Sequence, residues 1–136
     1  MGEKKLIIIS GKRKRAIAKV RITNGDGKIF YNSLPYQELK TFHKLALMEP
    51  IRICENVLGD FKFDIEIKTK GGGKEAQIQA ARLGIARALF KFTNEAKLKE
   101  AFLKYDRNML VADVRRKEAR KPGDSKARAK RQKSYR

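Results

Sequence analysis

The last 22 residues of this 136-residue chain offer almost nothing that a folded core could use. Residues 115–136 hold 11 basic and 2 acidic side chains, and their apolar content is alanine, one proline and Tyr135. Such a segment buries too little surface to offset the entropy lost on ordering. We therefore predict a globular domain at residues 1–114 and an extended basic tail at residues 115–136, which stays disordered until a partner supplies counter-charge.

The charge of the whole chain indicates what that partner is. The sequence has 34 Lys and Arg against 15 Asp and Glu, a formal net charge of +19, whose self-repulsion a polyanion would relieve. No apolar run approaches the roughly 20 residues of a membrane-spanning helix, and the tail offers only Tyr135 where a membrane-surface segment would have Phe, Trp or Leu. Nucleic acid is the expected partner. Pro122 and Gly123 break any long basic helix, which favours structured RNA over a DNA groove.

Hydropathy patterns divide the globular part into strands and helices. Alternation of apolar and polar residues predicts half-buried strands, and helical spacing of apolar residues predicts helices. The turn formers at residues 24–27 predict a hairpin between the second and third strands. The predicted strands are residues 5–10, 16–23, 28–31 and 61–69, and the predicted helices are residues 33–48, 75–92 and 94–105.

This order of elements predicts an α+β two-layer sandwich, with helices on one face of a mixed sheet. Ser33 and Pro35 are expected to begin the first helix, and Pro50 is expected to end or interrupt it. Asn94 is expected to cap the last helix, which should turn Leu98, Ala101, Phe102 and Tyr105 inward.

Two loops of the domain are candidate phosphate sites. The run Lys12–Arg15 is predicted to connect the first two strands, and Gly71–Gly73 with Lys74 precedes the longest predicted helix. Backbone N–H groups at a helix start can hold phosphate, although a plain strand-to-helix connection explains the glycines equally well. The loop is not a nucleotide-hydrolysing P-loop, because Glu75 stands where Ser or Thr is required.

No group of residues supports catalysis or metal binding. His43 is the single histidine and has no neighbouring ligands, and a pair with the single cysteine, Cys54, is far less plausible than a core thiol and an ordinary imidazole. The single cysteine also excludes an intrachain disulfide and favours a reducing, cytoplasmic setting. Cross-strand ion pairing explains the acids at 60, 64 and 66. We expect no enzyme, no cofactor and no metal.

Several motifs together resemble a known family. The segment SGKRKRAIA at residues 10–18, the glycine loop, QIQAARLGIARAL at 77–89 and the terminus KARAKRQKSYR at 126–136 are similar to the small-subunit ribosomal protein S-nine family. The sequence resembles the archaeal or eukaryotic type of this family, and eukaryotic members are called S-sixteen. The resemblance implies the fold of the second domain of ribosomal protein S-five and a position on 16S rRNA in the head of the 30S subunit, beside other ribosomal proteins.

The resemblance also implies roles for individual residues. The family's tail reaches the tRNA in the peptidyl (P) site, which by position assigns tRNA contact to Lys133, Ser134 and Arg136. Tyr135 replaces the lysine of bacterial members, so that lysine's contacts are not carried over. The residues expected to bind rRNA are Lys12, Arg13, Lys14, Arg15, Gly71, Gly72, Gly73, Lys74, Arg115, Arg116, Lys117, Arg120, Lys121, Lys126, Arg128, Lys130 and Arg131.

Two other functions share the predicted topology. One is the protein subunit of a catalytic ribonucleoprotein such as RNase P, and the other is a small-molecule kinase of the homoserine or mevalonate type. The basic tail argues against the first function. The short chain and the missing Gly/Ser-rich phosphate loop argue against the second.

Overall fold

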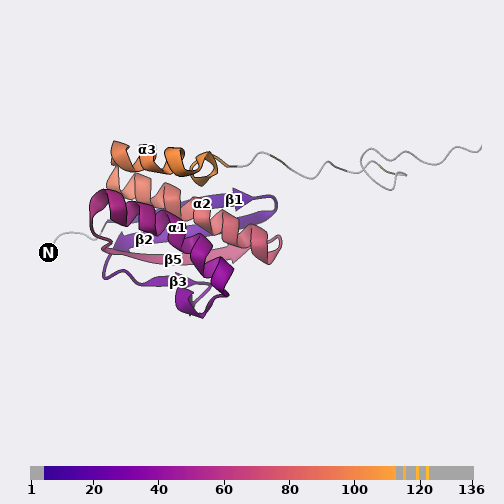
Figure 1. The fold of residues 1–136 in the computed structure, drawn as a ribbon. Helices are drawn as coiled ribbons and strands as arrows, with labels where there is room; N and C mark the ends of the chain where they lie inside the picture. Colours follow the sequence, from indigo (N-terminus) through magenta and orange to yellow (C-terminus); the bar gives the residue numbers. More distant parts are fainter. Residues whose placement is uncertain (1–4, 113–114, 116–118, 120–121, 123–136) are drawn as a thin grey trace, which may run out of the picture.

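Five strands form one mixed sheet, and the helices pack on one of its faces (Figure 1). The structure, a computed structural model, describes residues 5–112 and, beyond them, Arg115, Ala119 and Pro122. The strands are β1 (Leu6–Arg13), β2 (Ala16–Asn24), β3 (Ile29–Tyr31), β4 (Leu34–Pro35) and β5 (Phe63–Lys70). The helices are α1 (Thr41–Leu58), α2 (Lys74–Thr93) and α3 (Ala96–Tyr105), with 3-10 turns η1 (Tyr36–Glu38) and η2 (Arg107–Met109).

The strand order is β1-β2-β5-β3-β4. β1, β2 and β5 are successively antiparallel, and β3 runs parallel to β5. Helix α2 lies across β1 and β2, α1 lies beside α2, and α3 packs on both helices (Figure 1). The predicted mixed sheet with helices on one face is confirmed. It gains a short fifth strand, β4, which pairs with β3.

Two glycines let α2 lie directly against the sheet. A Cβ on Gly11 of β1 would be 2.1 Å from the carbonyl oxygen of Ala80 and 2.7 Å from the amide nitrogen of Gly84. A Cβ on Gly84 of α2 would be 2.7 Å from a methyl carbon of Val20. Side chains at these positions would push the helix away from β1 and β2. The backbone contact fixes the end of β1 relative to α2.

The core lies between the sheet and the helices. The predicted alternation along β2 is confirmed, because Ala16, Ala18, Val20 and Ile22 are fully buried and the residues between them are not. Leu98 and Phe102 of α3 are buried as expected, but Tyr105 is 58% exposed. The prediction that Tyr105 faces inward is wrong, because α3 ends at this residue.

The predicted hairpin between the second and third strands is wrong, because β5 lies between β2 and β3. The loop instead crosses the start of β5. The Asp64 carboxylate accepts hydrogen bonds from the amides of Asp26 and Lys28, both at 3.1 Å, and the Gly25 amide donates to the Lys62 carbonyl at 3.1 Å. These bonds replace the strand pairing that a tight turn would have made.

The first helix begins later and ends later than its sequence predicts. Ser33 has a left-handed φ of 70°, Pro35 lies in β4, and α1 begins at Thr41. Pro50 neither ends nor interrupts the helix, which continues through it to Leu58. Proline removes one backbone hydrogen bond, but buried side chains on both sides of it hold the helix together: Leu47, Ile51 and Cys54.

Asn94 ends α2 instead of beginning α3. Its φ of 55° is left-handed, and its amide donates to the Phe90 carbonyl at 2.7 Å. Asparagine tolerates this conformation and is used at helix C-termini for the same reason as glycine. The residue that precedes α3 is Glu95, which makes no side-chain capping bond.

Candidate nucleic-acid interface

The basic run at the β1–β2 connection is tighter than its sequence suggests. The strand register continues to the pair Arg13–Ala16, so only Lys14 and Arg15 form the turn. The prediction that the basic run at residues 11–15 forms a loop is wrong for Gly11, Lys12 and Arg13, which belong to β1. The turn is possible because Lys14 adopts a φ of 54°. It holds two exposed cations at the rigid end of a hairpin.

The glycine loop packs its backbone against this turn. Gly71 and Gly72 have φ values of 76° and 64°, in the region that favours glycine. A Cβ on Gly71 would lie 2.8 Å from the Arg15 carbonyl oxygen, and one on Gly72 would lie 2.9 Å from the Ala16 nitrogen. The loop therefore brings the basic turn to the beginning of α2.

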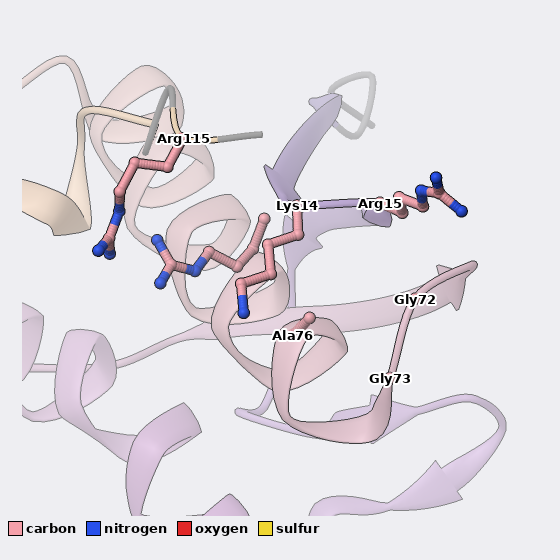
Figure 2. Close-up of a pocket in the computed structure, with 7 residues that line it drawn as sticks. Lys14, Arg15, Gly72, Gly73, Ala76 and Arg115 are labelled. Carbon is pink, nitrogen blue, oxygen red and sulfur yellow. The ribbon is translucent and has the colours of Figure 1, made fainter. Parts of the chain in front are cut away.

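Helix α2 begins beside these cations. Its N-cap, Gly73, has no side chain, so no capping side chain occupies the first-turn amides, which lie at the positive end of the helix dipole. Gln77 supports the loop, because its side-chain nitrogen donates to the Gly71 carbonyl at 3.0 Å. Figure 2 shows Lys14 extending toward Ala76 in this first turn, whereas Arg15 points away from it.

A cleft of about 730 Å³ lies between the turn and α2, and we name it the turn cleft (Figure 2). No acidic side chain is among the described residues that line it. Its lining is Arg13, Lys14, Arg15, Gly72, Gly73, Ala76 and Arg115. Lysine and arginine side chains near a helix N-terminus form an environment suited to phosphate. Contact with phosphate itself stays a prediction.

The turn cleft brings together predicted residues of both loops and Arg115 from the predicted tail, whereas Lys12 lines a neighbouring hollow instead. Gly71 packs on Arg15 behind the turn cleft, and Lys74 is exposed at the first residue of α2. The remaining predicted residues lie outside the described part of the chain: Arg116, Lys117, Arg120, Lys121, Lys126, Arg128, Lys130, Arg131, Lys133, Ser134 and Arg136.

Other basic residues of the domain are engaged in structural contacts. Arg82 of α2 bridges two carboxylates, at 2.6 Å from Glu49 and 3.3 Å from Asp106. It thereby ties α2 to α1 and to the residue after α3. Arg87 donates to the Leu110 carbonyl at 2.9 Å. Arg13 and Arg115 of the turn cleft also line a neighbouring hollow that contains the carboxylates of Glu49 and Asp106.

Sequence reasoning missed four exposed cations on the sheet: Lys19, Arg21, Lys68 and Lys70. They occupy the polar positions of two alternating strands, and Figure 1 shows the helices on the other face. Their alternation was visible in the sequence, but the strand pairing that places them side by side was not.

The residues considered for catalysis have structural roles. The His43 ring nitrogen Nε2 lies 2.7 Å from a Glu75 carboxylate oxygen. Cys54 lies three turns further along α1, about 16 Å away along the helix axis. Burial, and secondarily the charge of Glu55, raises the pKa of the Cys54 thiol to about 11, so it is protonated at neutral pH. These two residues form no nucleophile–base pair.

The acids of β5 and the residues before it are only partly explained by ion pairing. Lys62 lies 3.9 Å from Asp60 and Lys68 lies 3.9 Å from Glu66, and both pairs run along the chain, not across strands as predicted. Among the described residues, no three potential ligands are grouped to hold a metal ion. In the same part of the chain, no helix has the length and apolarity needed to cross a bilayer.

Comparison with known proteins identifies the family. The family model described as Ribosomal protein S9/S16 matches residues 11–136. The chain belongs to the ribosomal protein S9/S16 family. The match includes the basic turn, the glycine loop and every predicted site residue. Family membership confirms that the chain is a non-enzymatic structural protein, as expected.

Curated S9/S16 relatives align along nearly the whole chain. The protein called small ribosomal subunit protein uS9 in Methanococcus vannielii is 43% identical over 135 residues, covering 97% of this chain and 99% of the relative. The proteins of the same description in two strains of Methanococcus maripaludis are 43% and 42% identical, with the same coverage. The archaeal or eukaryotic type expected from the sequence motifs is confirmed by these archaeal relatives.

Proposed function

We propose that this S9/S16 family protein is a structural constituent of the small (30S) ribosomal subunit, in the cytoplasm, and serves translation. Its domain binds 16S rRNA in the subunit head, beside other ribosomal proteins, and its basic tail contacts P-site tRNA. The names of the archaeal relatives support the assignment to the small subunit. The domain is further proposed to share the fold of the second domain of ribosomal protein S-five.

The turn cleft is the observation that carries the rRNA part of this proposal. It places Lys14 and Arg15 at a rigid turn beside uncapped amides of α2, and no acid is among the described residues that line it. Cations neutralise phosphates and release their counterions, which makes affinity depend on salt. Backbone N–H groups add contacts that fix the orientation of the RNA.

The tail adds a second source of phosphate contacts. Residues 115–136 carry 11 basic side chains, and the final segment, residues 125–136, has 6 basic side chains and no acidic one. We propose that this tail orders along rRNA and that Lys133, Ser134 and Arg136 reach the tRNA backbone. Its boundary with the domain at residue 114 is part of the proposal.

Binding to the 3′ major domain of 16S rRNA tests the turn cleft. The variant carrying Lys14→Gln and Arg15→Gln should bind about tenfold more weakly at moderate salt, and the slope of log affinity against log salt should fall by about 1.5. The matched control carries Lys97→Gln and Lys104→Gln, which remove the same charge from exposed positions on α3. Equal affinities and slopes for the two variants would contradict a role for the turn cleft.

Truncation tests the tail. Removal of residues 125–136 should leave the thermal unfolding of the domain unchanged, because the buried core that the described residues form lies within residues 16–109. Small subunits assembled with the truncated protein should retain P-site tRNA more weakly than subunits assembled with the full chain. Unchanged tRNA retention would reject the tRNA contact and leave the turn cleft unaffected.

A further inference from the structure

The face of the sheet opposite the helices carries its own cluster of cations. We name it the open face, and it presents Lys19 and Arg21 from β2 together with Lys68 and Lys70 from β5. All four side chains are exposed, and none lines the turn cleft. Their fixed places on paired strands make them a preformed surface.

The strand register sets two lysines directly opposite each other. Lys19 of β2 pairs with Lys68 of β5, and Lys70 pairs with Ile17 one step nearer the basic turn. Neighbouring strands are about 4.8 Å apart, and like charges at directly opposed positions destabilise a sheet. The repulsion between the two lysines does not stabilise the isolated domain. A polyanion that lies across both strands would offset this repulsion, because both lysines would be attracted to it.

The two acids on the open face do little to neutralise these lysines. The Asp64 carboxylate is held by the amides of Asp26 and Lys28 at the opposite end of β5. Glu66 reaches Lys68 only at 3.9 Å, with 42% and 73% of the two side chains exposed, so this pair is weak. The half of the open face nearest the basic turn therefore keeps its positive charge.

The hollow and the side chains of the open face indicate which kind of anion it binds. A hollow of about 210 Å³ lies among Ile8, Lys19, Arg21, Glu66 and Lys68. Of the aromatic side chains on the sheet, only Phe30 is exposed on this face among the described residues, and it lies opposite Glu66 at the end away from the lysines. Unstacked bases are usually held by aromatic side chains, whereas duplex RNA is read through its backbone and 2′-hydroxyls. The lysine half of the open face fits a duplex backbone.

We propose that the open face is a second RNA-binding surface, which holds the sugar–phosphate backbone of a double-helical rRNA segment through Lys19, Arg21, Lys68 and Lys70. This inference rests on the proposed ribosomal function and deepens it. The domain would then contact rRNA on both sides of the sheet, with the turn cleft on the helix side.

The first test neutralises the opposed lysines in the full chain. The variant carrying Lys19→Gln and Lys68→Gln should bind the 3′ major domain of 16S rRNA about tenfold more weakly at moderate salt, with a salt slope lower by about 1.5. Its melting temperature should be unchanged or higher, because the like-charge pair is removed. The control again carries Lys97→Gln and Lys104→Gln on α3, where Glu95 and Glu100 alternate with the lysines.

The second test maps the surface directly. Because Cys54 is fully buried, Lys68→Cys supplies a single reactive thiol for an iron–EDTA probe that cleaves nearby RNA by hydroxyl radicals. Probes at Lys68→Cys and Lys14→Cys should cleave different rRNA segments, and the cleavage from position 68 should fall on both strands of a duplex. A probe at Lys97→Cys provides the background.

Three outcomes separate the explanations. If the wild-type protein does not bind this RNA, the proposed function fails. If it binds and only the variant of Lys14 and Arg15 weakens binding, the open face is not an RNA surface and this inference alone is overturned. If the variant of Lys19 and Lys68 keeps full rRNA affinity but fails to enter subunits assembled with the other head proteins, the face belongs to an acidic protein partner and the inference is again overturned.

Discussion

The two faces of β2 differ in what they contribute to the protein. On the helix side, Ala16, Ala18, Val20 and Ile22 are fully buried. On the open side, the alternate positions hold Ile17, Lys19, Arg21 and Thr23, and the two cations among them are exposed. One strand therefore carries stability on one face and charge for binding on the other, so substitutions of adjacent residues should separate the two properties.

Ile22 and its neighbour Arg21 provide the sharpest form of this comparison. Ile22→Ala should reduce the free energy of unfolding by about 2–5 kcal/mol, because it leaves a cavity between the sheet and the helices. Arg21→Ala should change it by less than about 0.5 kcal/mol, as is usual for exposed positions. Denaturant unfolding of the two variants measures the difference. Similar losses of stability would show that the open face also supports the core.

Gly72 and Gly73 extend the comparison to the turn cleft, with a smaller expected effect. Gly72→Ala should cost about 1–2 kcal/mol of stability, because its φ is 64° and the new Cβ would press on Ala16. It should also weaken rRNA binding, since the basic turn would be displaced. Gly73→Ala is the matched control for stability, because a Cβ there meets no atom within 4 Å. Thermal unfolding of both variants and rRNA binding of the Gly72→Ala variant test this coupling.

Local patterns were sufficient for much of the fold. The alternation along β2 and the helical spacing of α2 predicted their buried faces, because each pattern depends only on neighbours in the chain. The arrangement after β2 was not predictable in this way, since β5 inserts between β2 and β3 by pairing with strands that lie about 40 residues earlier in the chain. Pro50 was misread for a similar reason, because burial of its neighbours outweighs the lost hydrogen bond.

The candidate site also has a part that the sequence predicts and a part that it does not. The basic run between two predicted strands and the glycines before a predicted helix marked Lys14, Arg15 and the glycine loop as candidates, and the structure supplied the reason for the glycines, which is backbone contact with the turn. The opposed lysines at 19 and 68 could not be predicted, because they depend on the register between β2 and β5. The sequence therefore identifies the charged residues, whereas strand pairing determines which of their side chains lie side by side.

The pH dependence of unfolding tests the buried side of the sheet through Cys54, and its expected effect on stability is the smallest of the three. The folded domain raises the pKa of this thiol to about 11 from 9.0, so the native state binds the proton more tightly than the unfolded state does. The resulting stability should be complete below pH 9 and should be lost as the pH rises toward 11, with a slope of at most about 1.4 kcal/mol per pH unit. Cys54→Ala should remove this part of the pH dependence when unfolding is measured from pH 8 to 11. Tyr31, whose pKa burial also raises, stays in both proteins and cancels from the comparison. Identical pH profiles would mean that the Cys54 thiol reaches solvent in the folded protein. Rapid alkylation of Cys54 in the native protein would show the same exposure.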